Sequence, residues 1–176
     1  MKVLLLGGSK SGKSILAQSL CRRLAAGGLM YYWATMEPHD DEDLARIARH
    51  LADRAGWGFR TVECGRALPA ALPQVSPSGT VLFDSVTALL SNEMFGAEMD
   101  AAAPARAAQE LLQISRGVRH FVCVCDDIFR DAGHYDEWTE RYRAGLAAIC
   151  RTLAPEFDTV AEVAAGLPIC HKGVLP

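Results

Sequence analysis

The chain has 176 residues, half of them hydrophobic and 22% charged, and its 18 Lys and Arg against 21 Asp and Glu give a formal charge of −3. This length and apolar content predict a single domain over residues 1–176 with its own core, and they exclude a globally disordered chain. The slight acidity argues against binding nucleic acid by phosphate neutralisation, although a small anionic ligand needs only a local positive site.

Short apolar runs alternate with longer amphipathic stretches, which is typical of strand–helix units around a mostly parallel central sheet flanked by helices. In chain order, we expect a strand at 3–6, a helix at 13–26, a strand at 30–34, a charged helix at 41–54, a short strand at 60–62, a loop-rich connection at 69–79, a strand at 80–83, helices at 85–95 and 101–116, a strand at 121–125, a helix at 135–153, and a last strand at 159–164 before a short tail. The pattern predicts one α/β domain.

The cellular location can be predicted from what the sequence lacks. No apolar run approaches the roughly 20 residues of a membrane span, and the run at 3–6 is too short for a signal peptide. The cysteines form no C-x-x-C pair. We therefore expect a cytoplasmic protein with reduced thiols rather than a disulfide framework. A zinc site built on Cys123, Cys125 and either His120 or His171 is less favoured still.

The strongest chemical signal lies between the first expected strand and the first expected helix. Residues 7–14 read G-G-S-K-S-G-K-S, which fits the phosphate-loop pattern G-x-x-x-x-G-K-[ST]. The glycines let backbone N–H groups converge on phosphate oxygens, and the helix N-terminus adds a partial positive charge. We expect a P-loop NTPase in which Lys13 reaches the β- and γ-phosphates and the Ser14 hydroxyl binds Mg²⁺. The alternative is a glycine-rich turn that binds nothing.

A carboxylate is needed to complete the Mg²⁺ shell, and it usually follows a neighbouring hydrophobic strand. Asp84 comes directly after the apolar run at 80–83 and is the expected metal ligand. Its alternative role is to cap the following helix. Asp126 and Asp127, which end the next apolar strand, are the competing pair.

The expected charged helix at 41–54 carries a histidine. His50 shares one face with Glu42 and Arg46, and the apolar face that would dock this helix is formed by Leu44, Ile47 and Leu51. On its own, His50 reads as a surface histidine in a row of charges. A neutral imidazole is nevertheless a competent nucleophile toward an activated phosphorus.

Several motifs occur together in a characteristic order. The phosphate loop is followed by A-T at 34–35, D-D-E at 40–42, R-I-A-R-H at 46–50, T-V-E-C at 61–64, D-S-V-T-A-L-L-S-N at 84–92 and A-G-L-P at 165–168. This set resembles the bifunctional adenosylcobinamide kinase/adenosylcobinamide-phosphate guanylyltransferase family of cobalamin biosynthesis, over nearly the whole chain.

The resemblance implies a RecA-like P-loop fold, a homotrimer and two reactions on a corrinoid small molecule. In the first, a nucleoside triphosphate (ATP or GTP) phosphorylates the aminopropanol hydroxyl of adenosylcobinamide. In the second, a histidine attacks the α-phosphate of GTP, releases pyrophosphate and passes GMP to the cobinamide phosphate, giving adenosyl-GDP-cobinamide. Arg46 or Arg54 could steady the α-phosphate as a bidentate donor.

The resemblance also assigns site residues. The R-I-A-R-H motif makes His50 the nucleophile, and Ser14 with Asp84 would bind the metal. The family's nucleotide contacts fall on Gly7, Gly8, Ser9, Lys10, Ser11, Gly12, Lys13, Ser14, Ala34, Thr35, Met36, Leu51, Ala52, Asp53, Arg54, Glu63 and Asp84.

Beyond residue 125 the sequence departs from the family pattern. Asp126-Asp127 replaces an Asn-Glu pair, and of a Phe-Arg-Asp motif only Arg143 and the aromatic Tyr142 remain. Two other functions therefore stay open. One is a different small-molecule P-loop kinase with a structural His50, which would transfer a γ-phosphate and never trap GMP. The other is a degenerate GTP-binding module without turnover.

Overall fold

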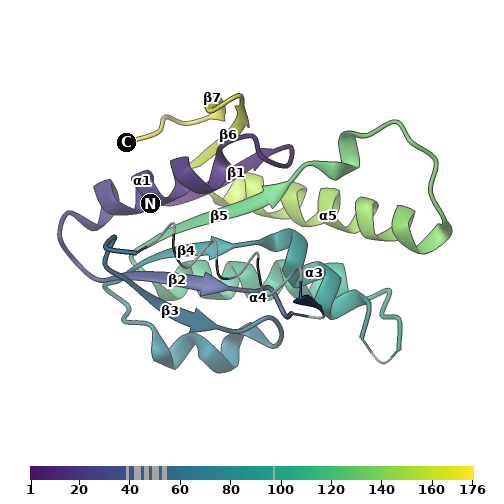
Figure 1. Cartoon of the computed structure of the whole chain (residues 1–176), viewed down its shortest axis with the longest axis horizontal. Coiled ribbons are helices and arrows are strands. Elements are labelled where there is room, and N and C mark those ends of the chain that lie inside the picture. The colour runs from purple at the N-terminus through teal and green to yellow at the C-terminus, as the bar shows by residue number, and fades with distance from the viewer. Residues whose placement is uncertain (39, 42–44, 46–47, 49–51, 53–54, 97) are drawn as a thin grey trace.

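A computed structural model describes residues 1–38, 40–41, 45, 48, 52, 55–96 and 98–176. Its elements follow the alternation of strands and helices expected from the sequence (Figure 1). In chain order they are β1 (Lys2–Gly7), α1 (Lys13–Ala25), β2 (Met30–Ala34), β3 (Phe59–Glu63), the 3-10 helix η1 (Leu68–Gln74), β4 (Thr80–Asp84), α3 (Val86–Met94), α4 (Ala103–Gly117), β5 (His120–Asp126), the 3-10 helix η2 (Ile128–Arg130), α5 (Glu137–Glu156), β6 (Thr159–Ala164) and β7 (Leu167–Lys172).

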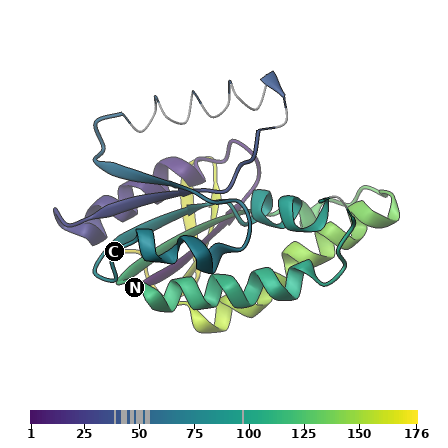
Figure 2. The ribbon, with the colours of Figure 1, turned by 90° about the horizontal axis from the view of Figure 1, so that it is seen from below.

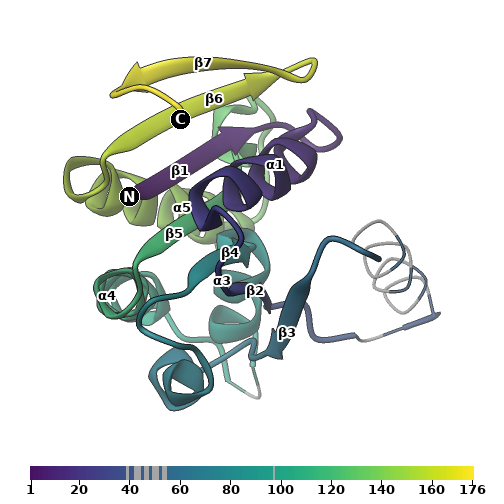
Figure 3. The same cartoon turned by 90° about the vertical axis from the view of Figure 1, so that its left-hand side faces the viewer.

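The described strands form one sheet in the order β3-β2-β4-β5-β1-β6-β7. The pairs along the sheet are parallel from β3 to β6, and β7 pairs antiparallel with β6 at one edge (Figure 3). Where the connections are described, helices join successive parallel strands: α1 between β1 and β2, η1 between β3 and β4, α3 and α4 between β4 and β5, and α5 between β5 and β6. The predicted fold class, a mostly parallel sheet flanked by helices, is therefore confirmed.

The two faces of the sheet bury different side chains because successive residues of a strand point in opposite directions. On β1, Leu4 packs into the larger hydrophobic cluster, which includes residues of α3, α4 and α5. Val3 and Leu5 pack on the other face, with Ala17 and Leu20 of α1. Figure 2 shows this arrangement, with α1 on one side of the sheet and α4 and α5 on the other.

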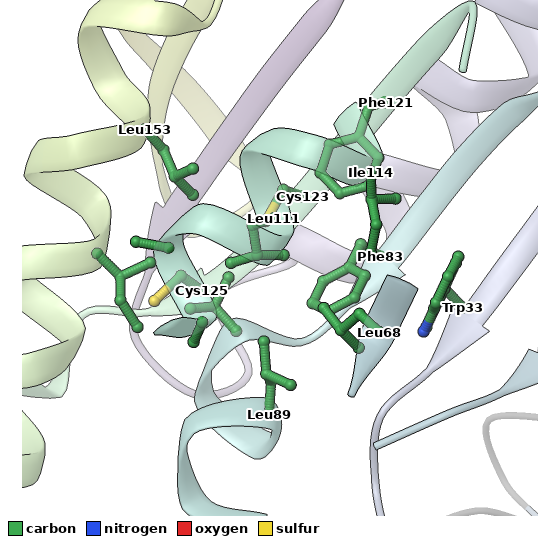
Figure 4. Packing of buried hydrophobic residues seen from close by; sticks show 14 of the residues in the cluster. Trp33, Leu68, Phe83, Leu89, Leu111, Ile114, Phe121, Cys123, Cys125 and Leu153 are labelled. Atoms are coloured by element: carbon green, nitrogen blue, oxygen red, sulfur yellow. The ribbon is translucent and has the colours of Figure 1, made fainter. Parts of the chain in front are cut away.

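Aromatic side chains from neighbouring strands lie next to one another in the larger cluster (Figure 4). The ring centroids of Trp33 and Phe83 are 6.1 Å apart, and those of Phe83 and Phe121 are 5.8 Å apart. Cys123 and Cys125 of β5 share this face, as their spacing predicts. All six cysteines are free thiols. Among the described residues, no helix is long and apolar enough to cross a bilayer.

Two segments differ from the expectations. The short tail expected after the sixth strand contains β7, which forms a hairpin with β6 through Ala165 and Gly166, both at positive φ. A two-residue turn of this kind matches the twist of an antiparallel pair. The residues of β7 are all exposed, and their sequence L-P-I-C-H-K lacks the apolar–polar alternation that marks a half-buried strand. The connection at 69–79, expected as loop, largely forms η1.

The register of the sheet positions several predicted site residues together. Glu63, Ala34 and Asp84 lie side by side at the carboxyl ends of β3, β2 and β4. Gly7, where the phosphate loop begins, lies opposite Asp126 at the end of β5. Because ligands of open α/β sheets bind at the carboxyl ends of the strands, this edge is the candidate site.

Candidate active site

The phosphate-loop sequence connects β1 to α1 in a backbone path that two of its glycines permit. Gly12 has φ +96° at the N-cap of α1, and a Cβ on it would lie 3.0 Å from the Cα of Gly166. A Cβ on Gly7 (φ +154°) would collide with the carbonyl oxygen of Val163. The Gly166 N–H donates to the Ser11 carbonyl over 2.8 Å, so the β6–β7 hairpin holds the loop from one side.

Lys13 is the charged centre of this loop, and its side chain is only 6% exposed. Its Nζ donates to the Gly8 carbonyl (2.6 Å) and lies 2.9 Å from Asp126 Oδ1 and 3.5 Å from Ser11 Oγ. An ammonium removed from water needs such partners. One acid of the competing pair, Asp126, therefore contacts the phosphate-loop lysine directly.

Asp84 ends β4 at the same edge of the sheet. Its Oδ2 accepts a hydrogen bond from the Tyr32 hydroxyl over 2.9 Å. The cap of α3 is instead Ser85, whose Oγ accepts from the Ala88 N–H at 3.2 Å. The alternative reading of Asp84 as the cap of the next helix is therefore wrong, and its carboxylate is held at the strand end by the β2 tyrosine.

Thr35 ties the end of β2 to the end of β4. Its N–H donates to the Asp84 carbonyl (3.2 Å), and its Oγ1 accepts from the Ser85 N–H (2.7 Å). The Asn92 amide donates to the carbonyls of Thr35 (2.7 Å) and Gly65 (3.1 Å). The A-T and D-S-V-T-A-L-L-S-N motifs, distant in sequence, are thus joined by hydrogen bonds beside Asp84.

A second group of charges lies on the other side of the phosphate loop. Arg130 of η2 forms ion pairs with Glu162 of β6 and, over 3.4 Å, with Asp127. His171 of β7 lies 3.2 Å from Glu162. The Arg130 guanidinium, followed by His171, holds the pKa of the Glu162 carboxyl below its usual range. The Asp127 N–H donates to the Gly7 carbonyl (3.2 Å), which fixes this group against the loop.

The structure describes only a few residues of the expected charged helix at 41–54. His50, Leu51, Asp53 and Arg54 lie outside the described residues, as do Glu42 and Arg46. Residues 41, 45, 48 and 52 are described, and all four are helical and exposed, which agrees with the expected helix. The nucleophile and its neighbours stay predictions.

The remaining predicted nucleotide contacts lie in the phosphate loop and at or just after the ends of the strands. Ser9 and Lys10 are exposed and Ser14 is half-buried in the first turn of α1. Glu63 is exposed, while Met36 follows Thr35 in the β2 connection. The sequence analysis missed the contacts of Tyr32, Arg130 and Glu162. Glu162 could have been found, because it lies near the carboxyl end of the strand that pairs with β1.

Among the described residues, no group of three or more His, Cys, Asp or Glu side chains could hold a metal ion by itself. Mg²⁺ bound with nucleotide needs fewer protein ligands, because phosphates and waters supply the others. A hydroxyl from Ser14 and a carboxylate from Asp84 are the hard oxygen donors that Mg²⁺ prefers. The donor chemistry therefore fits a phosphate-bound Mg²⁺.

Comparison with protein families and relatives gives a consistent result. A family model described as cobinamide kinase / cobinamide phosphate guanyltransferase matches residues 3–170. The bifunctional adenosylcobalamin biosynthesis protein CobU of Salmonella typhimurium is 33% identical over 98% of this chain and all of that protein. The bifunctional adenosylcobalamin biosynthesis protein CobP of Pseudomonas aeruginosa is 31% identical, over 98% of each chain.

Solved structures with a similar fold are more distant in sequence. The flagellar accessory protein FlaH of Methanocaldococcus jannaschii is 14% identical with a TM-score of 0.51, over 98% of this chain and 78% of that one. The P4 protein of bacteriophage phi6, solved with ADP, is 15% identical with a TM-score of 0.51, over 95% and 52%. A third structure, an ATPase domain, is 9% identical with a TM-score of 0.52, over 92% and 68%. These likenesses show the P-loop NTPase fold.

Proposed function

This chain belongs to the cobinamide kinase / cobinamide phosphate guanyltransferase family, and from that premise we propose that it performs both reactions of cobalamin assembly in turn. It phosphorylates adenosylcobinamide with a nucleoside triphosphate, then transfers GMP from GTP to adenosylcobinamide phosphate to give adenosyl-GDP-cobinamide. The observation that carries this proposal is the buried Lys13 ammonium within the phosphate loop, at the edge where Asp84 and Asp126 also lie.

The phosphate loop would bind the triphosphate in both reactions. Its backbone N–H groups and the N-terminus of α1 favour phosphate oxygens, and Lys13 would stabilise the charge that develops on the departing phosphates. In the kinase step the leaving group is a nucleoside diphosphate, and in the guanylyl step it is pyrophosphate. In both reactions the leaving group gains its negative charge on the β-phosphate, so one phosphate loop can stabilise it in both.

We assign the metal ligands to Ser14 and Asp84, on the donor chemistry described above. When bound, Mg²⁺ neutralises phosphate charge. Tyr32 would keep the Asp84 carboxylate at the strand end through its 2.9 Å hydrogen bond.

The guanylyl step is assigned to His50. Its imidazole nitrogen would attack the α-phosphorus of GTP, forming a P–N bond while the bond to the bridging oxygen breaks and pyrophosphate leaves. An oxygen of the cobinamide phosphate would then attack the same phosphorus and release the imidazole. Covalent catalysis of this kind divides one difficult displacement into two easier ones.

The first experiment tests this covalent step. Protein is incubated with Mg²⁺ and GTP labelled at the α-phosphate, denatured, and examined for bound label. We expect acid-labile label on the unmodified protein and on a His134→Ala control, and none on His50→Ala. Absence of label from all three proteins, under conditions where GTP binds, would contradict the transferase assignment and leave a kinase or a binding module.

We further infer a single domain over residues 1–176, a homotrimer and a cytoplasmic location. The trimer rests on the family resemblance, the location rests on the sequence pattern and the free cysteines, and the single domain rests on length and on the sheet shared by both hydrophobic clusters. Light scattering tests the trimer, because the chain mass is 19.0 kDa and the assembly should have three times that mass.

A further inference from the structure

The two proposed reactions differ in the chemistry of their acceptors. The kinase acceptor is an alcohol, whose proton must leave as its oxygen attacks the γ-phosphorus. The guanylyl acceptor is a phosphate, which is already ionised near neutral pH and needs no base. A general base near the triphosphate would therefore serve the first reaction alone.

Among the described residues, three aspartates at the carboxyl ends of β4 and β5 are candidates for this base. Asp126 is ion-paired with the Lys13 ammonium at 2.9 Å, which suits an acid that orients the phosphate-loop lysine. Asp84 accepts from the Tyr32 hydroxyl and stands at the end of β4, where the metal ligand is expected. The third acid, Asp127, occupies a different position.

Asp127 lies against the first residues of the phosphate loop. Its N–H donates to the Gly7 carbonyl over 3.2 Å, so its backbone is fixed there. Its Oδ1 is 3.9 Å from the point where a Cβ on Gly8 would lie, so the carboxylate faces the loop. The side chain is only 16% exposed, and its other oxygen lies 3.4 Å from Arg130 Nη1.

Arg130 gives this carboxylate a defined orientation. The guanidinium also bonds Glu162 of β6, whose strand pairs with β1, so it is fixed from two sides. The contact uses one oxygen of Asp127, and the other faces Gly8.

We propose that Asp127 is the general base of the kinase reaction, an inference that rests on the proposed function. Its carboxylate accepts the proton of the acceptor hydroxyl while the hydroxyl oxygen bonds to the γ-phosphorus. The bond from that phosphorus to the β–γ bridging oxygen breaks, and the nucleoside diphosphate leaves with the electron pair. The proton stays on Asp127 until solvent removes it.

The test separates the two reactions in one variant. Asp127→Asn keeps the shape of the side chain but cannot accept the proton. We expect its kinase turnover on adenosylcobinamide to fall by about 100-fold or more, the usual contribution of a general base. Trapping of labelled GMP, and its transfer to adenosylcobinamide phosphate supplied directly, should match the unmodified protein. Asp127→Glu should recover part of the kinase rate.

The control is Asp158→Asn, which removes a carboxylate that accepts from the Lys2 N–H at the opposite edge of the sheet. It should leave both reactions unchanged.

Normal kinase turnover in Asp127→Asn would overturn the base assignment while the proposed function stands. Equal loss of kinase turnover, trapping and transfer would overturn it too, because that pattern reports damaged nucleotide binding. A failure of the proposed function is distinguishable, since the unmodified protein would then neither phosphorylate the alcohol nor trap GMP.

Discussion

Lys13 carries an ammonium that Asp126 neutralises in the free protein and that the phosphates of a bound nucleotide would also neutralise. Its ammonium is buried among loop oxygens and Asp126, a carboxylate that is itself 31% exposed. A buried cation that loses its carboxylate partner keeps the cost of its burial. A bound triphosphate would supply negative charge at the same place. The role of Asp126 should therefore depend on whether nucleotide is bound.

This dependence gives a prediction for Asp126→Asn. Without nucleotide, the variant should be less stable by about 1–3 kcal/mol, because the Lys13 ammonium loses a charged partner. With saturating GTP and Mg²⁺ the difference should narrow, since phosphate replaces the missing charge. Thermal unfolding of both proteins, with and without GTP, measures the two differences.

The matched control is Glu156→Gln, which breaks the exposed ion pair with Arg116. Exposed pairs contribute roughly 0–1 kcal/mol, and this one should be insensitive to nucleotide. An equal loss of stability for Asp126→Asn with and without GTP would show that the carboxylate stabilises the fold independently of nucleotide.

At the scale of elements, the segment between β5 and α5 is organised by a single buried arginine. Arg143 of α5 is 7% exposed, and its guanidinium donates to the carbonyls of Ile128 (3.2 Å), Gly133 (3.3 Å) and Asp131. It also lies over the Tyr135 ring, 4.8 Å from the centroid. A planar guanidinium can serve several carbonyls at once, whereas an ammonium is a point charge. Arg143 therefore positions the loop that follows Asp127.

Arg143→Met should free this loop. We expect a loss of about 2–4 kcal/mol in unfolding free energy, because several carbonyls lose charged donors. Amide hydrogen exchange over residues 128–135 should rise more than in the strands, and Arg143→Lys should rescue little. The control, Arg141→Met, removes an exposed pair with Glu137 on the same helix. Unchanged exchange in Arg143→Met would mean that the loop holds its shape without the arginine.

The elements differ in how far the sequence could predict them. The phosphate loop and Asp84 were predictable, because their signals are local: glycines before a helix, and an acid directly after an apolar run. The contact between Lys13 and Asp126 was harder, because it depends on the insertion of β5 between β4 and β1. Strand order is a property of the whole sheet and leaves little trace in any one segment.

The C-terminal hairpin is a second feature that the sequence pattern did not predict. The A-G pair at 165–166 is a turn signal, but β7 is exposed along its length, including its apolar residues Leu167 and Ile169. Hydrophobic periodicity reports burial rather than backbone pairing, so an exposed edge strand is read as a tail. Yet Gly166 of this hairpin packs against the phosphate loop at Gly12, so the missed element helps to shape the site.

At the scale of the whole molecule, one sheet joins both hydrophobic clusters to the nucleotide edge. Side chains of β1 enter the clusters on both faces, and the phosphate loop continues directly from its end. The free energy of nucleotide binding at the loop should therefore stabilise the entire domain, and unfolding should be a single cooperative transition.

GTP with Mg²⁺ at about 100 times its dissociation constant should stabilise the fold by about 2.7 kcal/mol, which raises Tm by roughly 5–10 °C. Calorimetry measures this shift, and Lys13→Ala should lose most of it. Two transitions, only one of them moved by GTP, would contradict a single domain.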